Sequence, residues 1–140
     1  MIQSIRKTNM TNKDACQLLK QLTSAQLLSE KHFNEVIDNL PNNQEIFVYK
    51  QHNKFVGMIS VFIEQKLIHG GKCVAHLEDV VVDDNYRRNG IAFKLINHVI
   101  SYAESNNCYK VTLNCYDDKL PLYEKCNFKH TTNGMTYYLS

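Results

Sequence analysis

Three consecutive valines, Val80–Val82, constrain the fold more than any other feature of this 140-residue chain. Successive residues of a strand point to opposite faces, so an apolar run without alternation must be covered on both sides. The polar segment 83–89 follows, and from Gly90 to Ala103 apolar residues recur at helical spacing. The chain is therefore expected to form an α/β fold in which helices cover both faces of a sheet.

The remaining elements follow from the same kind of pattern. Strands are expected where apolar residues alternate or cluster between turn residues, and helices where they recur every three or four positions. The pattern predicts strands over 2–7, 46–49, 55–63, 74–82, 109–115, 128–131 and 135–139. It predicts helices after the cap Thr11, over 30–40, from Gly90 and over 121–126. No repeat or Pro/Gly-rich linker divides the chain, so residues 1–140 are expected to form a single domain.

Composition argues against several classes of function. Net charge is +2 with His neutral and the pI is about 8.2, too weak a bias for a nucleic-acid-binding domain. Neither a signal peptide nor a membrane-spanning stretch is evident, so a cytoplasmic protein without membrane association is expected. Five cysteines without a C-x-x-C pair indicate reduced thiols and no metal site.

The loop after the valine run has the composition of an anion site. A helix N-terminus offers unpaired N–H groups and the positive end of the helix dipole, which together suit a pyrophosphate. Gly90 removes a Cβ where a phosphate must approach the backbone, and Arg87 and Arg88 can add charge-assisted hydrogen bonds. The alternative is a solvated basic loop in front of an ordinary helix.

Arg87-x-x-Gly90-x-Ala92, placed after an apolar strand, resembles the acetyl-CoA motif Q/R-x-x-G-x-G/A of the GNAT acetyltransferase superfamily. A closer resemblance, to the glucosamine 6-phosphate N-acetyltransferases within that superfamily, rests on segments 64–69, 76–82, 107–115 and 122–128. This resemblance implies a mixed seven-stranded sheet that splays between the strands at Val82 and Tyr109. It also implies a homodimer in which the last strand contributes to the partner's site.

The resemblance further implies the cofactor and the residues that hold it. The pantetheine arm of acetyl-CoA is expected along the backbone of Val80, Val81 and Val82. The pyrophosphate is expected in the loop and first helical turn formed by Arg87, Arg88, Asn89, Gly90, Ile91 and Ala92. Tyr123 is expected beside the coenzyme A sulfur, where its phenol can protonate or hold the departing thiolate.

The implied reaction is direct acetyl transfer, in a ternary complex, to the amine of glucosamine 6-phosphate, which would serve UDP-N-acetylglucosamine biosynthesis and amino sugar metabolism. Glu78 and Asp79 are expected at the reacting centre, with the backbone N–H near Asp79–Val80 as oxyanion donor. As neighbours on a strand, these two acids are expected to point to opposite faces. The acceptor contacts are expected from Thr23, Lys66, His69, Glu78, Asp79 and Asn114.

Three positions depart from the family pattern. Asn114 stands where the family commonly has an acid, and an amide cannot take the proton of the amine. The segment 135–139 lacks the Arg that the family supplies to the phosphate, and Lys119 replaces an Asn that often contacts the cofactor arm. Three alternatives therefore stay open, namely another amine acceptor, an acetyl-CoA-binding module without turnover, and acyl transfer through Cys115 or Cys73.

Overall fold

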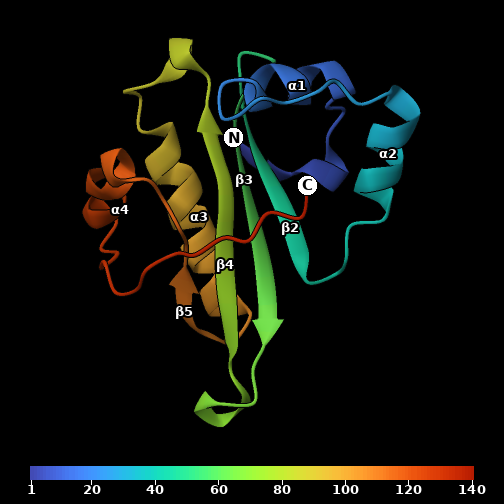
Figure 1. Ribbon diagram of the computed structural model, residues 1–140. Helices are drawn as coiled ribbons and strands as arrows, with labels where there is room; N and C mark the ends of the chain where they lie inside the picture. The colour runs from blue at the N-terminus through green and yellow to red at the C-terminus, as the bar shows by residue number, and fades with distance from the viewer.

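A five-stranded mixed sheet forms the centre of the computed structural model, which describes residues 1–140 (Figure 1). In spatial order its strands are β1 (Ile2–Ser4), β2 (Gln44–Gln51), β3 (Lys54–Gln65), β4 (Cys73–Val82) and β5 (Cys108–Thr112). Neighbouring strands are antiparallel except β4 and β5, which are parallel. The helices are α1 (Asn12–Leu19), α2 (Glu30–Asp38), α3 (Ile91–Ser105) and α4 (Leu120–Lys125).

Helices cover both faces of the sheet, as the valine run predicts. Val82 lies in the core under α3, together with Leu95 and Val99 of that helix. Val81 lies in the second core, on the opposite face, together with Leu18 of α1 and Phe33 of α2. Burial of consecutive valines on opposite faces confirms β4 as a strand covered from both sides. None of the helices combines the length and apolar character needed to cross a membrane.

The predicted start of α1 is confirmed in detail. The Thr11 hydroxyl accepts the Asp14 N–H at 3.1 Å, and the Asp14 carboxylate accepts the Thr11 N–H at 3.0 Å. This reciprocal capping box satisfies two of the donors that a helix N-terminus leaves open. α3, by contrast, begins at Gly90 with no side-chain cap.

The expectation of seven strands is wrong, because residues 128–131 and 135–139 form no strand. Their alternating pattern indicates strand propensity, but a strand is stable only where a neighbouring edge takes its hydrogen bonds. In this chain no sheet edge pairs with the segment, which crosses the sheet in Figure 1. Met135 and Leu139 are therefore more than nine-tenths exposed.

Two other predicted strands end earlier than expected. The segment 2–7 is a strand only to Ser4, and Ile5–Lys7 forms a turn of 3₁₀ helix. The segment 109–115 is a strand only to Thr112, so Asn114 and Cys115 follow β5 instead of lying within it. Because β5 ends at Thr112, Asn114 and Cys115 line the cleft of the candidate site instead of belonging to the strand.

Candidate functional site

The pairing of β4 with β5 ends halfway along β4. The parallel ladder runs from Cys73 opposite Cys108 to His76 opposite Thr112. β4 continues to Val82, so its residues 77–82 have no strand partner on that edge. Backbone N–H and C=O groups on an unpaired edge can bind an extended ligand as an added strand. The splay that the family resemblance implies is expected at this edge.

A β-bulge lies in the same part of β4. Asp79 and Val80 together oppose the single residue Ile59 of β3, so β4 carries one extra residue at this point. Asp79 has φ of 51°, a left-handed conformation that Asp adopts more readily than most residues. The ladder is therefore interrupted on the β3 side within the stretch that has no partner on the β5 side.

The bulge shifts the alternation of side chains along β4 by one residue. Leu77 and Val80 both contact the core under α3, although regular pleating would place them on opposite faces. The expectation that Glu78 and Asp79 point to opposite faces rests on regular pleating, and the bulge removes that premise. Both acidic residues are exposed. The sequence carries no signal for the bulge beyond two acids inside an apolar strand.

The N-terminus of α3 is open to an anion. Gly90 has φ of 73°, and a Cβ built there would meet no atom within 4 Å. Because no side chain caps the helix, its first N–H groups are available to a ligand. Arg88 is exposed and has φ of 67°, so its backbone also turns sharply at this loop.

Arg87 is held beside this helix start by contacts within the chain. Its Nη2 lies 2.8 Å from Asp84 Oδ1, and its Nε donates to the Val82 carbonyl at 3.3 Å. About half of the guanidinium side chain is exposed, and exposed ion pairs are worth at most about 1 kcal/mol. A phosphate can therefore replace Asp84 as the partner of Arg87.

The other predicted cofactor residues offer mainly their backbone. The side chains of five of these residues lie in or against the two cores: Val80, Val81, Val82, Ile91 and Ala92. Asn89 is exposed, and its amide donates to the Tyr86 carbonyl at 3.2 Å, which braces the loop.

Tyr123 on α4 is buried, and its ring meets Phe128 edge to face at a centroid distance of 5.8 Å. No hydrogen bond within the chain engages its hydroxyl, and no unpartnered polar side-chain atom is fully enclosed. Burial raises the pKa of the phenol to about 12, with smaller contributions from Cys115, Cys126 and Glu78. Tyr123 shares the core under α3 with Leu77, which precedes Glu78 on β4.

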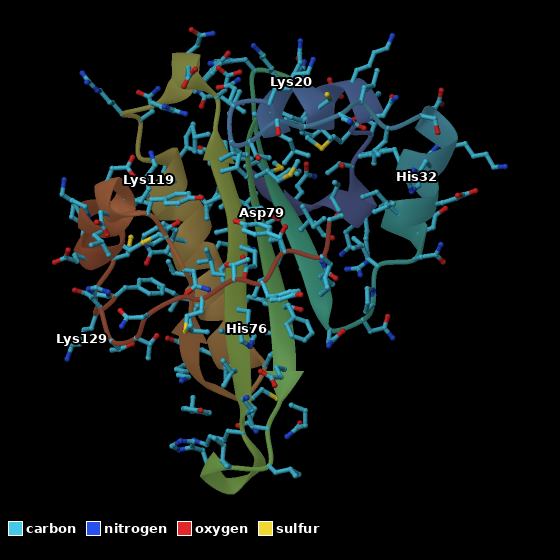
Figure 2. All side chains as sticks on the ribbon, in the orientation of Figure 1. Lys20, His32, His76, Asp79, Lys119 and Lys129 are labelled. Carbon is cyan, nitrogen blue, oxygen red and sulfur yellow. The ribbon has the colours of Figure 1, made fainter.

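An open cleft of about 940 Å³ follows the outer side of β5, between α3, α4 and the C-terminal segment. Tyr123 and Asn114 both line it, so these two predicted site residues share one space. Gly134 of the C-terminal segment approaches closely, since a Cβ there would lie 3.3 Å from Asn114 Oδ1. The chain's own C-terminal segment therefore lies over Asn114. Lys119 is exposed at the start of α4 (Figure 2).

Lys66 and His69 lie in the hairpin between β3 and β4, at the other end of β4. Lys66 Nζ is 3.1 Å from Glu64 Oε2, and His76 Nε2 is 2.8 Å from Glu64 Oε1. Hydrogen bonds from His76 and Lys66 lower the pKa of Glu64 and keep it ionised. His69 stacks on Tyr109 of β5 with ring centroids 4.0 Å apart.

These contacts create a polar row on the sheet face opposite α3. Lys66, Glu64 and His76 are linked in series, and Glu78 follows two residues after His76 on the same face. Two residues of strand span about 7 Å, so the row continues from His76 to Glu78 beside the bulge. Figure 2 marks His76 and Asp79 along β4. Glu64 and His76 were not among the predicted site residues, because only strand register brings them together.

Thr23 lies apart from this row, in the exposed loop after α1. The neighbouring Gln21 accepts the backbone N–H of Asp84 at 2.8 Å through its Oε1. The loop that carries Thr23 is therefore tied to the candidate pyrophosphate loop.

This fold and site match a known family. The model of the Acetyltransferase (GNAT) family matches residues 8–128. The chain belongs to the GNAT acetyltransferase family. This acetyltransferase is 35% identical over 116 residues to glucosamine 6-phosphate N-acetyltransferase of Trypanosoma brucei brucei, covering 81% of this chain and 79% of that protein. It is 31% identical over 134 residues to glucosamine 6-phosphate N-acetyltransferase 1 of Dictyostelium discoideum, covering 91% and 84%.

A solved structure extends the match over the whole acetyltransferase. The crystal structure of glucosamine-6-phosphate N-acetyltransferase from Arabidopsis thaliana aligns with a TM-score of 0.88 at 25% identity, covering 100% of this chain and 99% of that one. The chain thus groups with the glucosamine 6-phosphate N-acetyltransferases, which are acyltransferases. GNAT enzymes use acetyl-CoA, and the unpaired edge of β4 and the open start of α3 suit its extended arm and its pyrophosphate.

The environment of Arg87 predicts opposite effects for two neighbouring substitutions. Arg87→Gln should weaken coenzyme A binding about tenfold, because a charge-assisted hydrogen bond is lost. Asp84→Asn should leave the affinity unchanged or raise it, because the competing ion pair is removed. Isothermal titration calorimetry of both variants against coenzyme A measures the difference, and equal weakening by both would contradict this role of Arg87.

The raised pKa of Tyr123 predicts how stability depends on alkaline pH. The unfolded phenol titrates near pH 10, whereas the folded one titrates near 12, so its contribution is complete below pH 10 and is lost as pH rises towards 12. Urea unfolding between pH 9 and 12 should show a steeper loss of stability in the native protein than in Tyr123→Phe. Tyr116→Phe, at an 85% exposed position, should behave like the native protein.

Proposed function

We propose that this acetyltransferase transfers the acetyl group of acetyl-CoA directly to the 2-amino group of glucosamine 6-phosphate. One observation carries the proposal, which is that β4 loses its β5 partner and carries a bulge at Asp79–Val80 in the same stretch. Leu77 and Val80 of this stretch contact the core to which Tyr123 belongs. The names of the relatives support the acceptor. The product would serve amino sugar metabolism, and UDP-N-acetylglucosamine biosynthesis in particular.

The bulge of β4 supplies the electrostatic part of the reaction. It leaves a backbone N–H near Asp79–Val80 outside the ladder, where it can donate to the thioester oxygen as negative charge develops there. A donor placed in this way is worth about 3 kcal/mol in the transition state. The exposed carboxylates of Glu78 and Asp79 orient the amine, and Glu78 accepts the proton that the nitrogen loses as the N–C bond forms and the C–S bond breaks.

Tyr123 stabilises the departing thiolate without giving up its proton. Its pKa of about 12 lies well above that of an ordinary thiol, about 8.5, so full transfer of the phenolic proton to sulfur is unfavourable. A neutral phenol donates a hydrogen bond to the thiolate throughout the physiological pH range. The thiolate is then protonated from solvent as the product leaves.

The polar row supports an acceptor that carries an amine and a phosphate. Glu78 at the bulge suits the amine, and Lys66 with His69 at the hairpin suits the phosphate. The phosphate would compete with Glu64 for Lys66. Thr23, Asp79 and Asn114 are the further acceptor contacts of the proposal, and Asn114 would hold the amine through its amide oxygen.

The free cysteines argue for a reducing compartment and against a covalent mechanism. All five are unpaired, which is typical of a cytosolic protein. Burial raises the pKa of the Cys115 thiol, and Asp117 and Asp118 raise it further. A neutral thiol is a poor nucleophile, so direct transfer is favoured over an acetylated Cys115.

We also infer a homodimer in which the segment 135–139 pairs with the partner subunit. Tyr137 and Tyr138 are more than four-fifths exposed, like the two apolar residues on either side of them, and the outer edge of β5 has no strand partner. Exposed apolar strands and open edges are liabilities that association removes. Sedimentation should show a dimer for the full chain and a monomer for a chain ending at Asn133, and a monomeric full chain would contradict the inference.

Release of free thiol from acetyl-CoA tests the acceptor. Glucosamine 6-phosphate should support release, whereas glucosamine, glucosamine 1-phosphate and spermidine should support little. Release only with another amine would support acetyltransferase activity but would contradict glucosamine 6-phosphate as the acceptor. Coenzyme A binding without release for any amine would instead indicate a binding module.

A further inference from the structure

Two free cysteines face each other at the closed end of the β4–β5 pair. Cys73 and Cys108 are direct partners in the parallel register, and the Cys73 N–H donates to the Asn107 carbonyl at 3.0 Å. Neighbouring strands lie about 4.8 Å apart, and the Cα atoms of a disulfide are about 4.4–6.8 Å apart. The backbone at this point therefore meets the spacing that a disulfide needs.

The two side chains also lie on one face of the sheet. Both are half-buried and both pack against the core under α3. Burial raises the pKa of the Cys108 thiol, and the nearby Cys73 adds to the shift, in agreement with their proximity. The other three cysteines have no cysteine as a strand partner.

Cys73 is also part of a clamp on the hairpin between β3 and β4. The Gln65 amide donates through Nε2 to the carbonyls of Lys66 at 2.8 Å and Gly71 at 2.6 Å. Gln65 Oε1 accepts the Cys73 thiol at 3.5 Å. The thiol thus supports the side chain that ties the two ends of the hairpin turn, on which His69 lies.

We propose that Cys73 and Cys108 form a redox site that small-molecule disulfides oxidise to an intramolecular disulfide, and that this loosens the hairpin. Cys73, at the exposed contact with Gln65, attacks one sulfur of the reagent and releases one small thiol. Cys108 then attacks the Cys73 sulfur, which forms the internal disulfide and releases the second small thiol. Two protein thiols are oxidised, the reagent is reduced to two thiols, and the protons of the protein thiols pass to the released thiols.

The effect on the hairpin follows from the loss of one donor. Sulfur in a disulfide has no hydrogen to donate, so Gln65 loses its contact with Cys73. One hydrogen bond corresponds to about fivefold in an equilibrium constant. This expectation rests on the proposed function, which assigns the phosphate to Lys66 and His69. Oxidation should raise KM for glucosamine 6-phosphate about fivefold and leave coenzyme A binding unchanged.

The test treats the full chain with oxidised glutathione and locates the bond by peptide mass mapping. Native protein should lose two hydrogen atoms in mass and show the 73–108 cross-link. Cys108→Ser should instead retain a glutathione adduct on Cys73, and Cys73→Ser should leave Cys108 unmodified, whereas Cys16→Ala should cross-link like the native protein. A glutathione adduct alone on the native protein, or a cross-link between other cysteines, overturns the redox site. This readout stands even if glucosamine 6-phosphate is not the acceptor.

Two substitutions at Cys73 separate the clamp from the cross-link without an oxidant. Cys73→Ser keeps a hydroxyl donor for Gln65 and should keep the native KM, whereas Cys73→Ala removes the donor and should raise KM about fivefold. Coenzyme A affinity, measured by calorimetry, should be unchanged in both. Equal KM values for Ala, Ser and the oxidised native protein would overturn the proposed effect on the hairpin.

Discussion

Burial of β4 on both faces is the constraint on which the rest of the structure depends. Val81 packs under α1 and α2, and Val82 packs under α3, so one strand joins the two cores. Each fully buried valine contributes about 1.5–3 kcal/mol, a sizeable fraction of the roughly 5–15 kcal/mol by which a domain is stable. The position of β4 is therefore firmly held, and the groups at its end are presented at a defined place.

The proposed function depends on β4 being incompletely paired between Leu77 and Val82, which are buried, while Glu78 and Asp79 between them are exposed. Its backbone loses the β5 ladder after His76 and the regular β3 ladder at Asp79. Side-chain burial holds the strand while its hydrogen-bonding groups stay available. α3 follows from the same strand, so an unpaired edge and an uncapped helix start lie next to each other in sequence and in space. An extended ligand with a pyrophosphate at one end fits an unpaired strand edge that is followed by an uncapped helix start.

Some features of the site were predictable because they depend on local sequence. The capping box at Thr11, the amphipathic α3 and the conformation of Gly90 each arise within a few residues. Tyr123 was located through resemblance, and its burial was not predictable from its own helix. The pairing of Glu64 with His76 depends on strand register, which no local pattern shows.

The C-terminal segment 128–139 shows most clearly what local sequence patterns cannot predict. Its alternating apolar residues indicate a strand, and its propensity is real, but in one chain it finds no edge with which to pair. Strand formation needs hydrogen bonds from another part of the molecule or from another copy, and propensity does not specify that partner.

The resemblance carried by Arg87-x-x-Gly90-x-Ala92 indicated the GNAT family. The sequence by itself also determined that β4 is buried on both faces, that a helix beginning after Gly90 follows it, and that the chain is an α/β protein. These properties depend on apolar spacing and backbone chemistry within short stretches. Only the tertiary structure decided where β5 leaves β4, where the bulge falls and which side chains form the polar row. Those features arise from register between distant segments, and a shift of one residue would turn every side chain to the other face.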